Sequence, residues 1–218
     1  ETGKRRTLHA FEDPAAKWTK LIKKRLVRYE REDGVPMNGT LYLPPSYKEG
    51  DKLPCLLWAY PREYVKASDA GQVRATPNRY MSLRGSSHLF MLLNGYAVFD
   101  NASMPIVGPR RTANDTFIDQ VRMNGEAAVK ALTAEGCIDP QRVAVAGHSY
   151  GAFMTANLLA HSDMFCCGIA RSGAYNRTLT PFGFQREQRS YWDAPEVYYG
   201  MSPFMHADKM KTPLLLIH

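Results

Sequence analysis

The sequence of 218 residues has no apolar run that approaches the length of a membrane span, and it contains no internal repeat and no low-complexity tract. Its four cysteines and six histidines show no spacing typical of a metal site. It also lacks the HGGG-type loop with which lipases bind an oxyanion. These absences argue against a membrane protein, a repeat protein and a lipase, and we expect neither a metal nor a cofactor.

The net charge of +7 is concentrated near the N-terminus, where residues 1–32 hold ten Lys or Arg against five Asp or Glu. A nucleic-acid-binding protein needs such a basic run beside base-stacking aromatics or within a known binding module, and neither occurs. We therefore expect a solvated face, or a contact with a preceding domain, and no nucleic-acid partner.

The cysteines do not suggest disulfides. Cys166 and Cys167 are adjacent and poorly placed to pair with each other. Cys55 lies in an apolar, strand-like run, and Cys137 follows a helix-ending glycine. We predict four reduced thiols, three of them buried, in a reducing compartment.

One stretch has the pattern of a strand, a sharp turn and a helix. The apolar residues 143–146 lead into Gly147-His148-Ser149-Tyr150-Gly151, and a helix-compatible run follows. This is the pattern of a nucleophile elbow, with Ser149 at its tip. The glycines have a physical reason, since strand and helix nearly touch there and a Cβ would collide. The alternative is an ordinary glycine-rich turn with a surface serine.

The order of predicted elements gives the fold class. An antiparallel pair of strands comes first, and strands then alternate with helices, which predicts a mixed, mostly parallel sheet with helices on both faces. The predicted strands are 25–31, 36–43, 53–60, 96–100, 143–146, 165–170 and 214–217, the last read as a core strand; the predicted helices are 14–22, 88–95, 116–135, a run after the elbow, and 202–210.

Three long, polar and irregular segments each follow a predicted strand: residues 61–87, 101–115 and 171–199. In open α/β sheets, ligands bind beyond the carboxyl ends of the strands. We therefore expect the three segments to gather at the same edge of the sheet as Ser149.

Several segments resemble the catalytic domain of the prolyl oligopeptidase family of serine peptidases, and within it most of all the glutamyl endopeptidases of plastids and bacteria. The resemblance runs from about residue 25 to the end and implies an α/β-hydrolase fold. It rests on RVAVAGHSYGAF (142–153), FCCGIARS (165–172), SPFMHADKMKTPLLLIH (202–218), LWAYPREY (57–64) and RSGAYNRTLTPFGFQ (171–185).

The resemblance also implies neighbours for this chain. A β-propeller domain would precede it, with residues 1–24 as the linker and residues 25–218 as the N-terminal major part of the peptidase domain. The implied partners are peptide substrates with acidic residues. The implied location is soluble, in the cytoplasm or the plastid stroma.

In this family the catalytic residues come in the order Ser, Asp, His, and the resemblance places the Asp and the His beyond residue 218. We therefore expect the chain alone to be inactive. Asp193 and His206 also follow Ser149 in that order, but neither follows a predicted strand end. His148 is expected to point away from the line of attack.

Two donors would stabilise the oxyanion that forms when Ser149 attacks a peptide carbonyl. One is the backbone N–H of Tyr150, the residue after the nucleophile. The other, by resemblance, is the hydroxyl of Tyr60 at the end of the third strand. The alternative for Tyr60 is a simple packing role.

Selectivity for an acidic side chain needs a buried cation, and the planar fork of arginine suits a carboxylate. By resemblance the first specificity pocket is lined by the segment after the strand that follows the elbow helix. There we choose Arg177, with Arg186 and Arg189 as reserves and Phe184 beside them; a surface arginine is the alternative for each.

The predicted function is therefore a serine endopeptidase that works through an acyl-enzyme and cuts after Glu. The alternatives are a dipeptidyl- or acylaminoacyl-peptidase, an esterase, and a non-catalytic hydrolase-like fragment.

Overall fold

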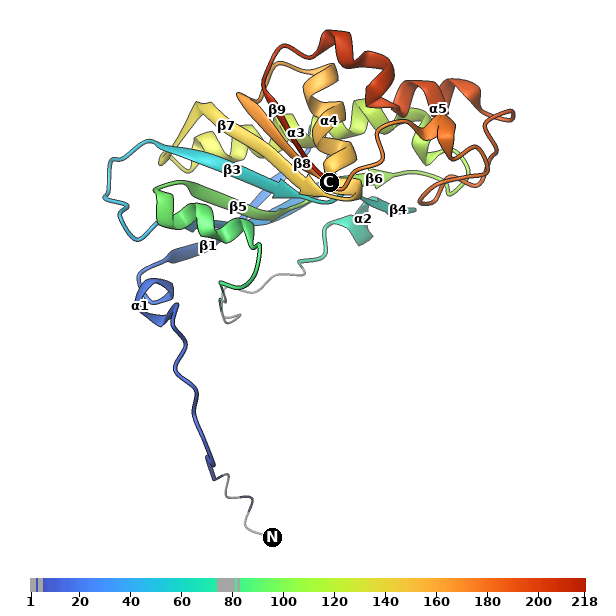
Figure 1. Ribbon diagram of the computed structural model, residues 1–218. Coiled ribbons are helices and arrows are strands. Elements are labelled where there is room, and N and C mark those ends of the chain that lie inside the picture. Colours follow the sequence, from blue (N-terminus) through green and yellow to red (C-terminus); the bar gives the residue numbers. More distant parts are fainter. Residues whose placement is uncertain (1–2, 4–5, 74–80, 82) are drawn as a thin grey trace.

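The computed structural model describes residues 3, 6–73, 81 and 83–218 (Figure 1). Its main sheet has seven strands in the order β1-β2-β5-β3-β7-β8-β9. The first two pairings in that order are antiparallel and the remaining four are parallel, so the predicted mixed, mostly parallel sheet is confirmed. The strands are β1 (Lys23–Glu30), β2 (Pro36–Leu43), β3 (Leu53–Ala59), β5 (Ala97–Ala102), β7 (Ile138–His148), β8 (Cys167–Arg171) and β9 (Leu214–Ile217).

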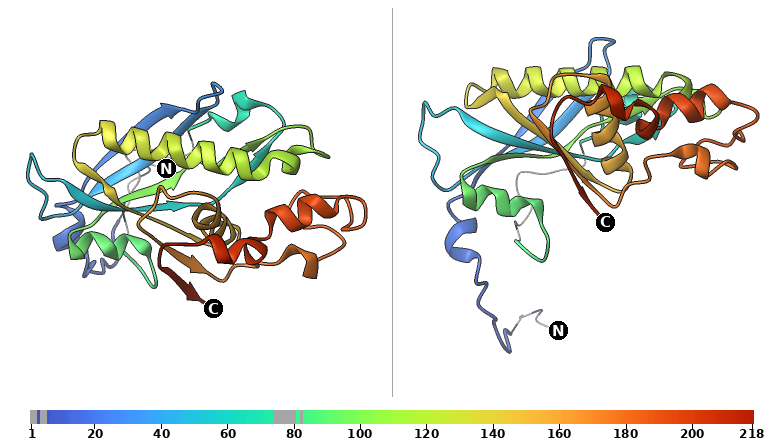
Figure 2. Two further views of the ribbon diagram at one scale, coloured as in Figure 1. Left: turned by 90° about the horizontal axis from the view of Figure 1, so that it is seen from above. Right: turned by 45° about the horizontal axis from the view of Figure 1, so that its top comes forward.

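Helices cover both faces of this sheet, as predicted (Figure 2). On one face α3 (Phe117–Ala134) and α4 (Tyr150–His161) pack over the larger hydrophobic core. On the other face the 3-10 helix η1 (His88–Asn94) packs over a smaller core. Strand β3 contributes side chains to both cores: Leu57 belongs to the larger core and Leu56 to the smaller one. This alternation is the period-2 geometry of a strand.

The sequence predicts where a helix ends better than it predicts the length or the type of the helix. Gly95 ends η1 with φ of 82°, a left-handed conformation that glycine adopts without cost. The predicted helix 14–22 is only one turn, α1 (Ala16–Thr19), and buries no residue. The predicted helix 202–210 is the 3-10 segment η4 (Pro203–Lys209), kinked at His206. Both corrections concern short segments that lack an apolar face long enough to hold a regular helix.

The three segments predicted to be irregular contain short elements. In the first two, β4 (Arg62–Tyr64) pairs in parallel with β6 (Pro105–Val107) to form a second, two-stranded sheet. Strands of three residues are too short for a period-2 pattern to stand out from the sequence. Residues 74–80 and 82 of the first segment lie outside the described residues. The remaining elements are α2 (Ala67–Ala70), η2 (Ala113–Thr116), η3 (Arg177–Leu179) and α5 (Pro195–Met201).

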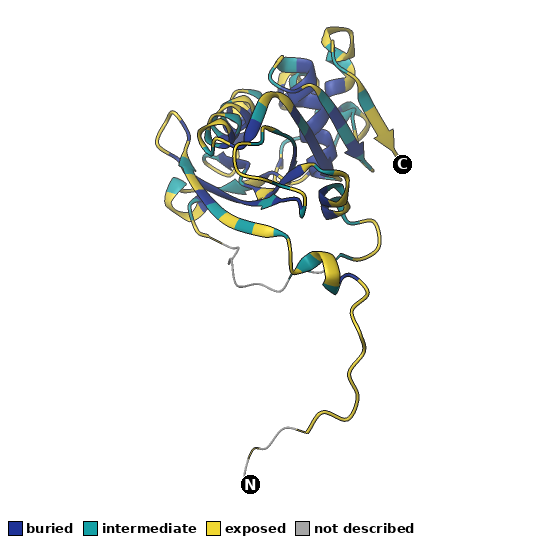
Figure 3. Cartoon of the chain, turned by 90° about the vertical axis from the view of Figure 1, so that its left-hand side faces the viewer, coloured by how far each residue is buried: buried dark blue, intermediate teal, exposed yellow. Residues whose placement is uncertain are grey.

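One burial prediction is wrong. Three cysteines are predicted to be buried, but only Cys55 and Cys137 are; Cys167 is half-buried and Cys166 is exposed, and all four are free thiols. Strand β9 is the last strand of the sheet that the described residues form, and it is largely exposed there (Figure 3). Its place in the core stays a prediction.

Residues 6–13 form no regular element and are exposed, and in the figures they extend away from the sheet. Strand β1 begins at Lys23, so the last two residues of the predicted linker belong to the sheet. The domain boundary at residue 24 otherwise stays a prediction.

Candidate functional site

Ser149 stands at a sharp turn between β7 and α4, with φ of 56° and ψ of −112°. The two flanking glycines permit this turn. A Cβ on Gly147 would lie 2.6 Å from the Cα of Gly151, and a Cβ on Gly151 would collide with the carbonyl oxygen of Ala59. This confirms the steric reason given for both glycines, and the geometry is that of a nucleophile elbow.

Backbone strain collects at this edge of the sheet. Among the described residues, four that are not glycine have a positive φ: Asn101, Ser149, Ser172 and Gln185. Asn101 is near the end of β5, Ser172 follows β8, and Gln185 lies in the segment after β8. Such conformations cost about 1–3 kcal/mol each and cluster where function requires them.

The hydroxyl of Ser149 has no hydrogen-bond partner among the described residues. Its backbone N–H donates to the carbonyl of Arg171 at 2.8 Å, which ties the elbow to the end of β8. His148 is exposed. The described part of the chain therefore positions Ser149 but offers it no base.

In the described part of the chain, Asp193 and His206 form no hydrogen bond with each other or with Ser149. Asp193 accepts hydrogen bonds from the hydroxyl and the N–H of Ser190, at 2.7 and 3.0 Å. The ring of His206 packs against that of His161, 4.6 Å between centroids, at the far end of α4. At 1.5 Å per residue that end is about 18 Å from Ser149.

Both expected oxyanion donors are beside the elbow. The N–H of Tyr150 belongs to the first turn of α4, where backbone donors have no partner within the helix. Tyr60 directly follows β3, and its ring packs edge-on against Tyr150 with 5.9 Å between centroids. Tyr60 is 43% exposed, so it is not a core residue and its hydroxyl can reach a ligand.

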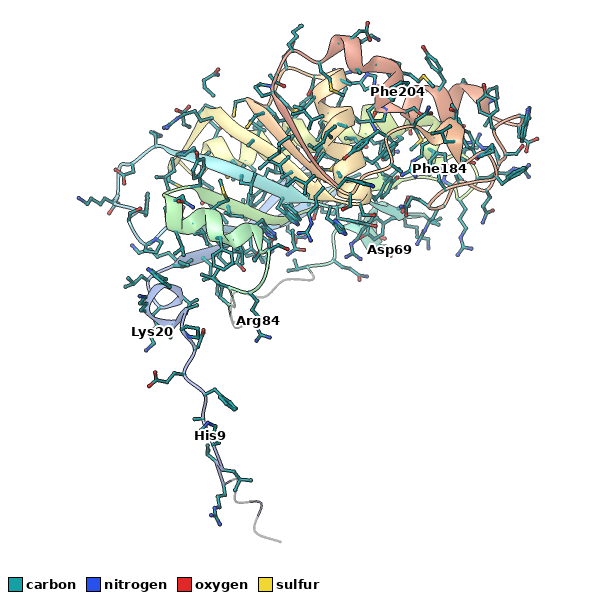
Figure 4. The ribbon with its side chains drawn as sticks, viewed as in Figure 1. His9, Lys20, Asp69, Arg84, Phe184 and Phe204 are labelled. Atoms are coloured by element: carbon teal, nitrogen blue, oxygen red, sulfur yellow. The ribbon has the colours of Figure 1, made fainter. Side chains whose placement is uncertain are left out.

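The loops at this edge line two open cavities, and Tyr60 lines both. The larger, of about 590 Å³, lies between the segment after β3 and the segment after β8. The smaller, of about 230 Å³, lies between the segment after β3 and the segment after β5. The predicted gathering of the three segments is therefore confirmed, and Figure 4 labels Asp69 and Phe184 from the first and the third. The larger cavity is lined by Tyr60, Pro61, Arg62, Glu63, Tyr64, Val65, Asp69, Gln72, Gln185 and Arg186.

Arg177 is buried and has no acidic partner in the described part of the chain. It is 7% exposed, and its guanidinium lies over the rings of Phe153 and Phe184, at 4.3 and 4.8 Å from their centroids. Its Nε has no hydrogen-bond partner among the described residues. Burial lowers the pKa of Arg177, but an arginine stays protonated in proteins. The guanidinium is thus a buried cation that packs on two aromatic faces and can bind an anion.

The two other candidate arginines differ from it. Arg189 donates to both carboxylate oxygens of Glu187, at 2.9 and 2.8 Å, and to Asp115 at 2.6 Å. These bonds raise its pKa and satisfy its charge within the chain, so the structure does not support Arg189 as a reserve. Arg186 is exposed and lines the larger cavity. Phe184 is buried and supports Arg177.

Two buried groups beside the elbow were not predicted from the sequence. The hydroxyl of Tyr150 and Oε1 of Glu63 are both buried, and the two side chains face each other. Burial, and then the charge of the Glu63 carboxylate and a hydrogen bond to it, raise the pKa of Tyr150 well above its usual value. The sequence places Tyr150 after the nucleophile but does not give the direction of its side chain.

A histidine–carboxylate contact on the other face of the sheet was also missed. Nε2 of His88 is 2.6 Å from Oδ1 of Asp100, and the His88 ring stacks on Trp58 with 4.2 Å between centroids. It fastens the start of η1 to β5, which gives it a structural role.

No group of three His, Cys, Asp or Glu side chains in the described ranges is arranged to hold a metal ion. Nor does the described part of the chain contain a helix of the length and apolar character that a membrane crossing requires.

Comparison with known proteins identifies the relatives of the chain. The sequence model of the prolyl oligopeptidase family matches residues 108–218. A probable chloroplastic glutamyl endopeptidase of Oryza sativa subsp. japonica is 51% identical over 199 residues, which are 89% of this chain and 21% of that protein. Its counterpart in Arabidopsis thaliana is 52% identical over 202 residues, 90% of this chain and 21% of that protein. The chain thus spans about a fifth of the length of these relatives.

Solved structures match over nearly the whole chain. A puromycin-hydrolyzing peptidase of Mycobacterium tuberculosis has a TM-score of 0.69 at 18% identity, covering 100% of this chain and 34% of that one. The acylaminoacyl peptidase of Pyrococcus horikoshii has a TM-score of 0.66 at 23% identity, covering 100% and 35%. At such identities these matches establish the α/β-hydrolase fold and no finer property.

Proposed function

This chain belongs to the prolyl oligopeptidase family, and we propose that it provides the nucleophile, the oxyanion hole and the specificity pocket of a serine peptidase. The observation that carries the proposal is the backbone of Ser149, held at φ of 56° between two glycines that have no room for a Cβ. Such strain has a cost, and a surface serine in an ordinary turn has no need of it.

The proposed reaction starts when Oγ of Ser149 attacks a peptide carbonyl and passes its proton to an imidazole. The N–H of Tyr150 and the hydroxyl of Tyr60 stabilise the oxyanion. The C–N bond then breaks, the leaving amine takes the proton from the imidazolium, and the acyl group remains on Ser149 as an ester. Water hydrolyses this ester by the same steps. We propose that the Asp and the His lie beyond residue 218, as in the family.

We further propose that the peptidase cleaves after Glu and that Arg177 binds the substrate carboxylate. Support comes from its burial, its aromatic support and its lack of an acidic partner among the described residues. The names of the two plant relatives point to the same specificity. Arg186, at the larger cavity, is placed to attract further acidic residues of a peptide. Arg189 instead holds Glu187 and Asp115 in place.

The proposed setting is a longer protein in which a β-propeller precedes this chain, located in the plastid stroma or the cytoplasm. The length of the relatives leaves room for such a domain, and both are named as chloroplastic.

A fluorophosphonate probe tests the proposal, because it reacts only with an activated serine. In the full-length protein we expect labelling of Ser149, and no labelling and no peptide cleavage after Ser149→Ala. Cleavage sites in a peptide library then separate the alternatives: cuts after internal Glu support an endopeptidase, whereas release of N-terminal dipeptides or acylated residues, or activity on esters alone, contradicts it. Strong labelling of residues 1–218 by themselves would show that the base lies within this chain, against our expectation.

A further inference from the structure

The smaller of the two cavities beside the elbow is lined by polar side chains and by one charge. Its volume is about 230 Å³. Pockets for drug-sized molecules begin at roughly 300 Å³, so this cavity suits a single residue of a peptide. Among the described residues, Arg62 is the only charged one that lines it. In the larger cavity, by contrast, the carboxylates of Glu63 and Asp69 line the wall together with arginines. The smaller cavity therefore favours an anion.

The backbone of Arg62 is fixed, and its guanidinium is available. Arg62 begins β4, which pairs with β6, and its N–H donates to the carbonyl of Met104 at 3.1 Å. Its side chain is exposed, and the arginine ion pairs within the described part of the chain do not include it. Tyr60, the proposed oxyanion donor, lines the same cavity. A peptide whose carbonyl lies at Tyr60 therefore has neighbouring residues within reach of Arg62.

A buried amide also lines this cavity. Asn38 of β2 is 6% exposed, and its side chain has no hydrogen-bond partner among the described residues. Its backbone is paired: its N–H donates to the hydroxyl of Ser103 at 3.1 Å, and that hydroxyl donates to its carbonyl at 2.8 Å. Native proteins pair most of their buried polar groups. An unpaired amide in the wall of a cavity indicates a polar ligand there.

The wall of the cavity is held in place by hydrogen bonds behind it. Asn101, which lines the cavity, has a left-handed backbone with φ of 51°. Its side-chain amide donates to Oδ2 of Asp100 at 2.7 Å, and Oδ1 of Asp100 is 2.6 Å from Nε2 of His88. The contact between His88 and Asp100 thus supports the cavity as well as η1. A wall that is already ordered reduces the entropy lost when a ligand binds.

We propose that this cavity is a second specificity site, in which the guanidinium of Arg62 and the side-chain amide of Asn38 bind a carboxylate of the substrate. Both groups donate hydrogen bonds, and a carboxylate accepts from both. The inference rests on the proposed function, since the carboxylate belongs to a peptide held at Ser149. It comes from an acidic side chain near the cleaved residue or from the C-terminus of a short peptide. The peptidase then recognises two acidic groups, one at Arg177 and one at Arg62.

The test measures kcat/KM of the full-length protein on peptides that keep Glu at the cleaved position. One set is amidated at the C-terminus and carries Glu or Gln at each neighbouring position in turn. A second set has Gln at all these positions and a free or an amidated C-terminus. We expect a Glu at one position, or the free C-terminus, to raise kcat/KM about tenfold, the usual effect of a hydrogen bond to a charged group.

Three variants assign this second preference. Arg62→Gln should abolish it, because the cation is lost from an exposed side chain that the fold does not need. Asn38→Asp should reverse it, because a like charge replaces a donor at nearly the same size. Arg110→Gln is the matched control and should retain it, since Arg110 is also exposed and lines neither cavity. Fluorophosphonate labelling of Ser149 checks that each variant is folded; if Asn38→Asp is not, Arg62→Gln decides.

The inference and the proposed function fail in different ways. No labelling of Ser149, or no preference for Glu at the cleaved position of the wild type, contradicts the proposed function. Normal cleavage after Glu without a second preference, or with one that Arg62→Gln leaves unchanged, overturns the inference alone. Equal losses in Arg62→Gln and Arg110→Gln also overturn it, because they would show a general attraction of charges and no site.

Discussion

Arg31 and Arg177 are both buried, yet one is fully matched within the chain and the other is not. Arg31, 2% exposed, follows β1 and donates from Nε and Nη2 to the two carboxylate oxygens of Asp33, both at 2.7 Å. Its Nη1 donates to Asn124, to the carbonyl of Pro105 and to Gln120, at 3.0, 3.2 and 3.3 Å. Arg177 has aromatic rings around its guanidinium and no carboxylate among the described residues.

The difference separates structure from function. Arg31 joins the hairpin, β6 and α3, and the desolvation of its charge is offset by acceptors that the chain supplies. At Arg177 the chain leaves that desolvation uncompensated, beside Ser149. A buried charge without an internal partner is thus better evidence for a ligand than a buried charge as such.

The largest expected effect is on stability at the matched site. Arg31→Met leaves the buried Asn124 and Gln120 with fewer donors, so we expect a loss of about 3 kcal/mol in the free energy of unfolding. Urea unfolding of the full-length protein measures it. The Glu-to-Gln ratio of kcat/KM should not change; a large change in this ratio would mean that Arg31 is not merely structural.

We expect Arg177→Met to have the opposite outcome: selectivity changes and stability does not fall. Removal of an unpaired buried cation should leave the free energy of unfolding equal or higher. The Glu-to-Gln ratio should fall by about 30-fold or more, corresponding to about 2 kcal/mol. Steady-state kinetics on the matched peptides give the ratio. A variant that is less stable but equally selective would place Arg177 with Arg31.

A pH titration sharpens the comparison further. Hydrogen bonds from Arg31 hold the pKa of Asp33 below its usual range. A lowered folded-state pKa stabilises the fold above the unfolded pKa of about 4, and this stabilisation is lost as the pH falls through the folded-state value. Thermal melting between pH 2 and pH 6 should therefore show a shallower acid loss for Asp33→Asn than for wild type. Parallel curves would contradict the pairing.

His161 provides a second titration. Its Nε2 is buried and has no hydrogen-bond partner among the described residues. Burial, and then His206, lower the pKa of His161 to about 4. Its neutral form is favoured in the fold, so stability should decrease as the pH falls from about 6.5 towards 4, where the unfolded chain binds the proton more readily. His161→Gln should remove this part of the pH dependence.

The smallest effect is expected at an exposed ion pair. Lys211 lies 3.1 Å from Asp163, and their side chains are 73% and 72% exposed. Such pairs contribute about 0–1 kcal/mol, so Lys211→Ala should change the urea midpoint little. A loss of unfolding free energy comparable to that of Arg31→Met would contradict the expectation that exposed charges contribute less than buried ones.

The sequence was sufficient for features whose cause is local. The strand, turn and helix around Ser149 could be predicted because its two glycines answer a steric need that is visible within five residues. The alternating strands and helices likewise gave the parallel sheet and the edge at which the loops meet. The glycine stop at Gly95 is of the same kind.

Pairings across the fold could not be predicted. Arg177 and Arg189 look alike in the sequence, and only the structure brings Asp115, 74 residues away, to Arg189. The direction of the Tyr150 side chain depends on how its ring packs against Phe117 of α3 and Phe153 of its own helix.

The most direct test uses two peptidyl phosphonates that differ only in Glu or Gln next to the phosphorus, with mass spectrometry to locate the modified residue in the full-length protein. We expect attachment at Ser149, and a rate constant for the Glu reagent at least about tenfold above that for the Gln reagent, with the advantage lost in Arg177→Met. Attachment at another residue, or equal rates for the two reagents in the wild-type protein, would contradict it.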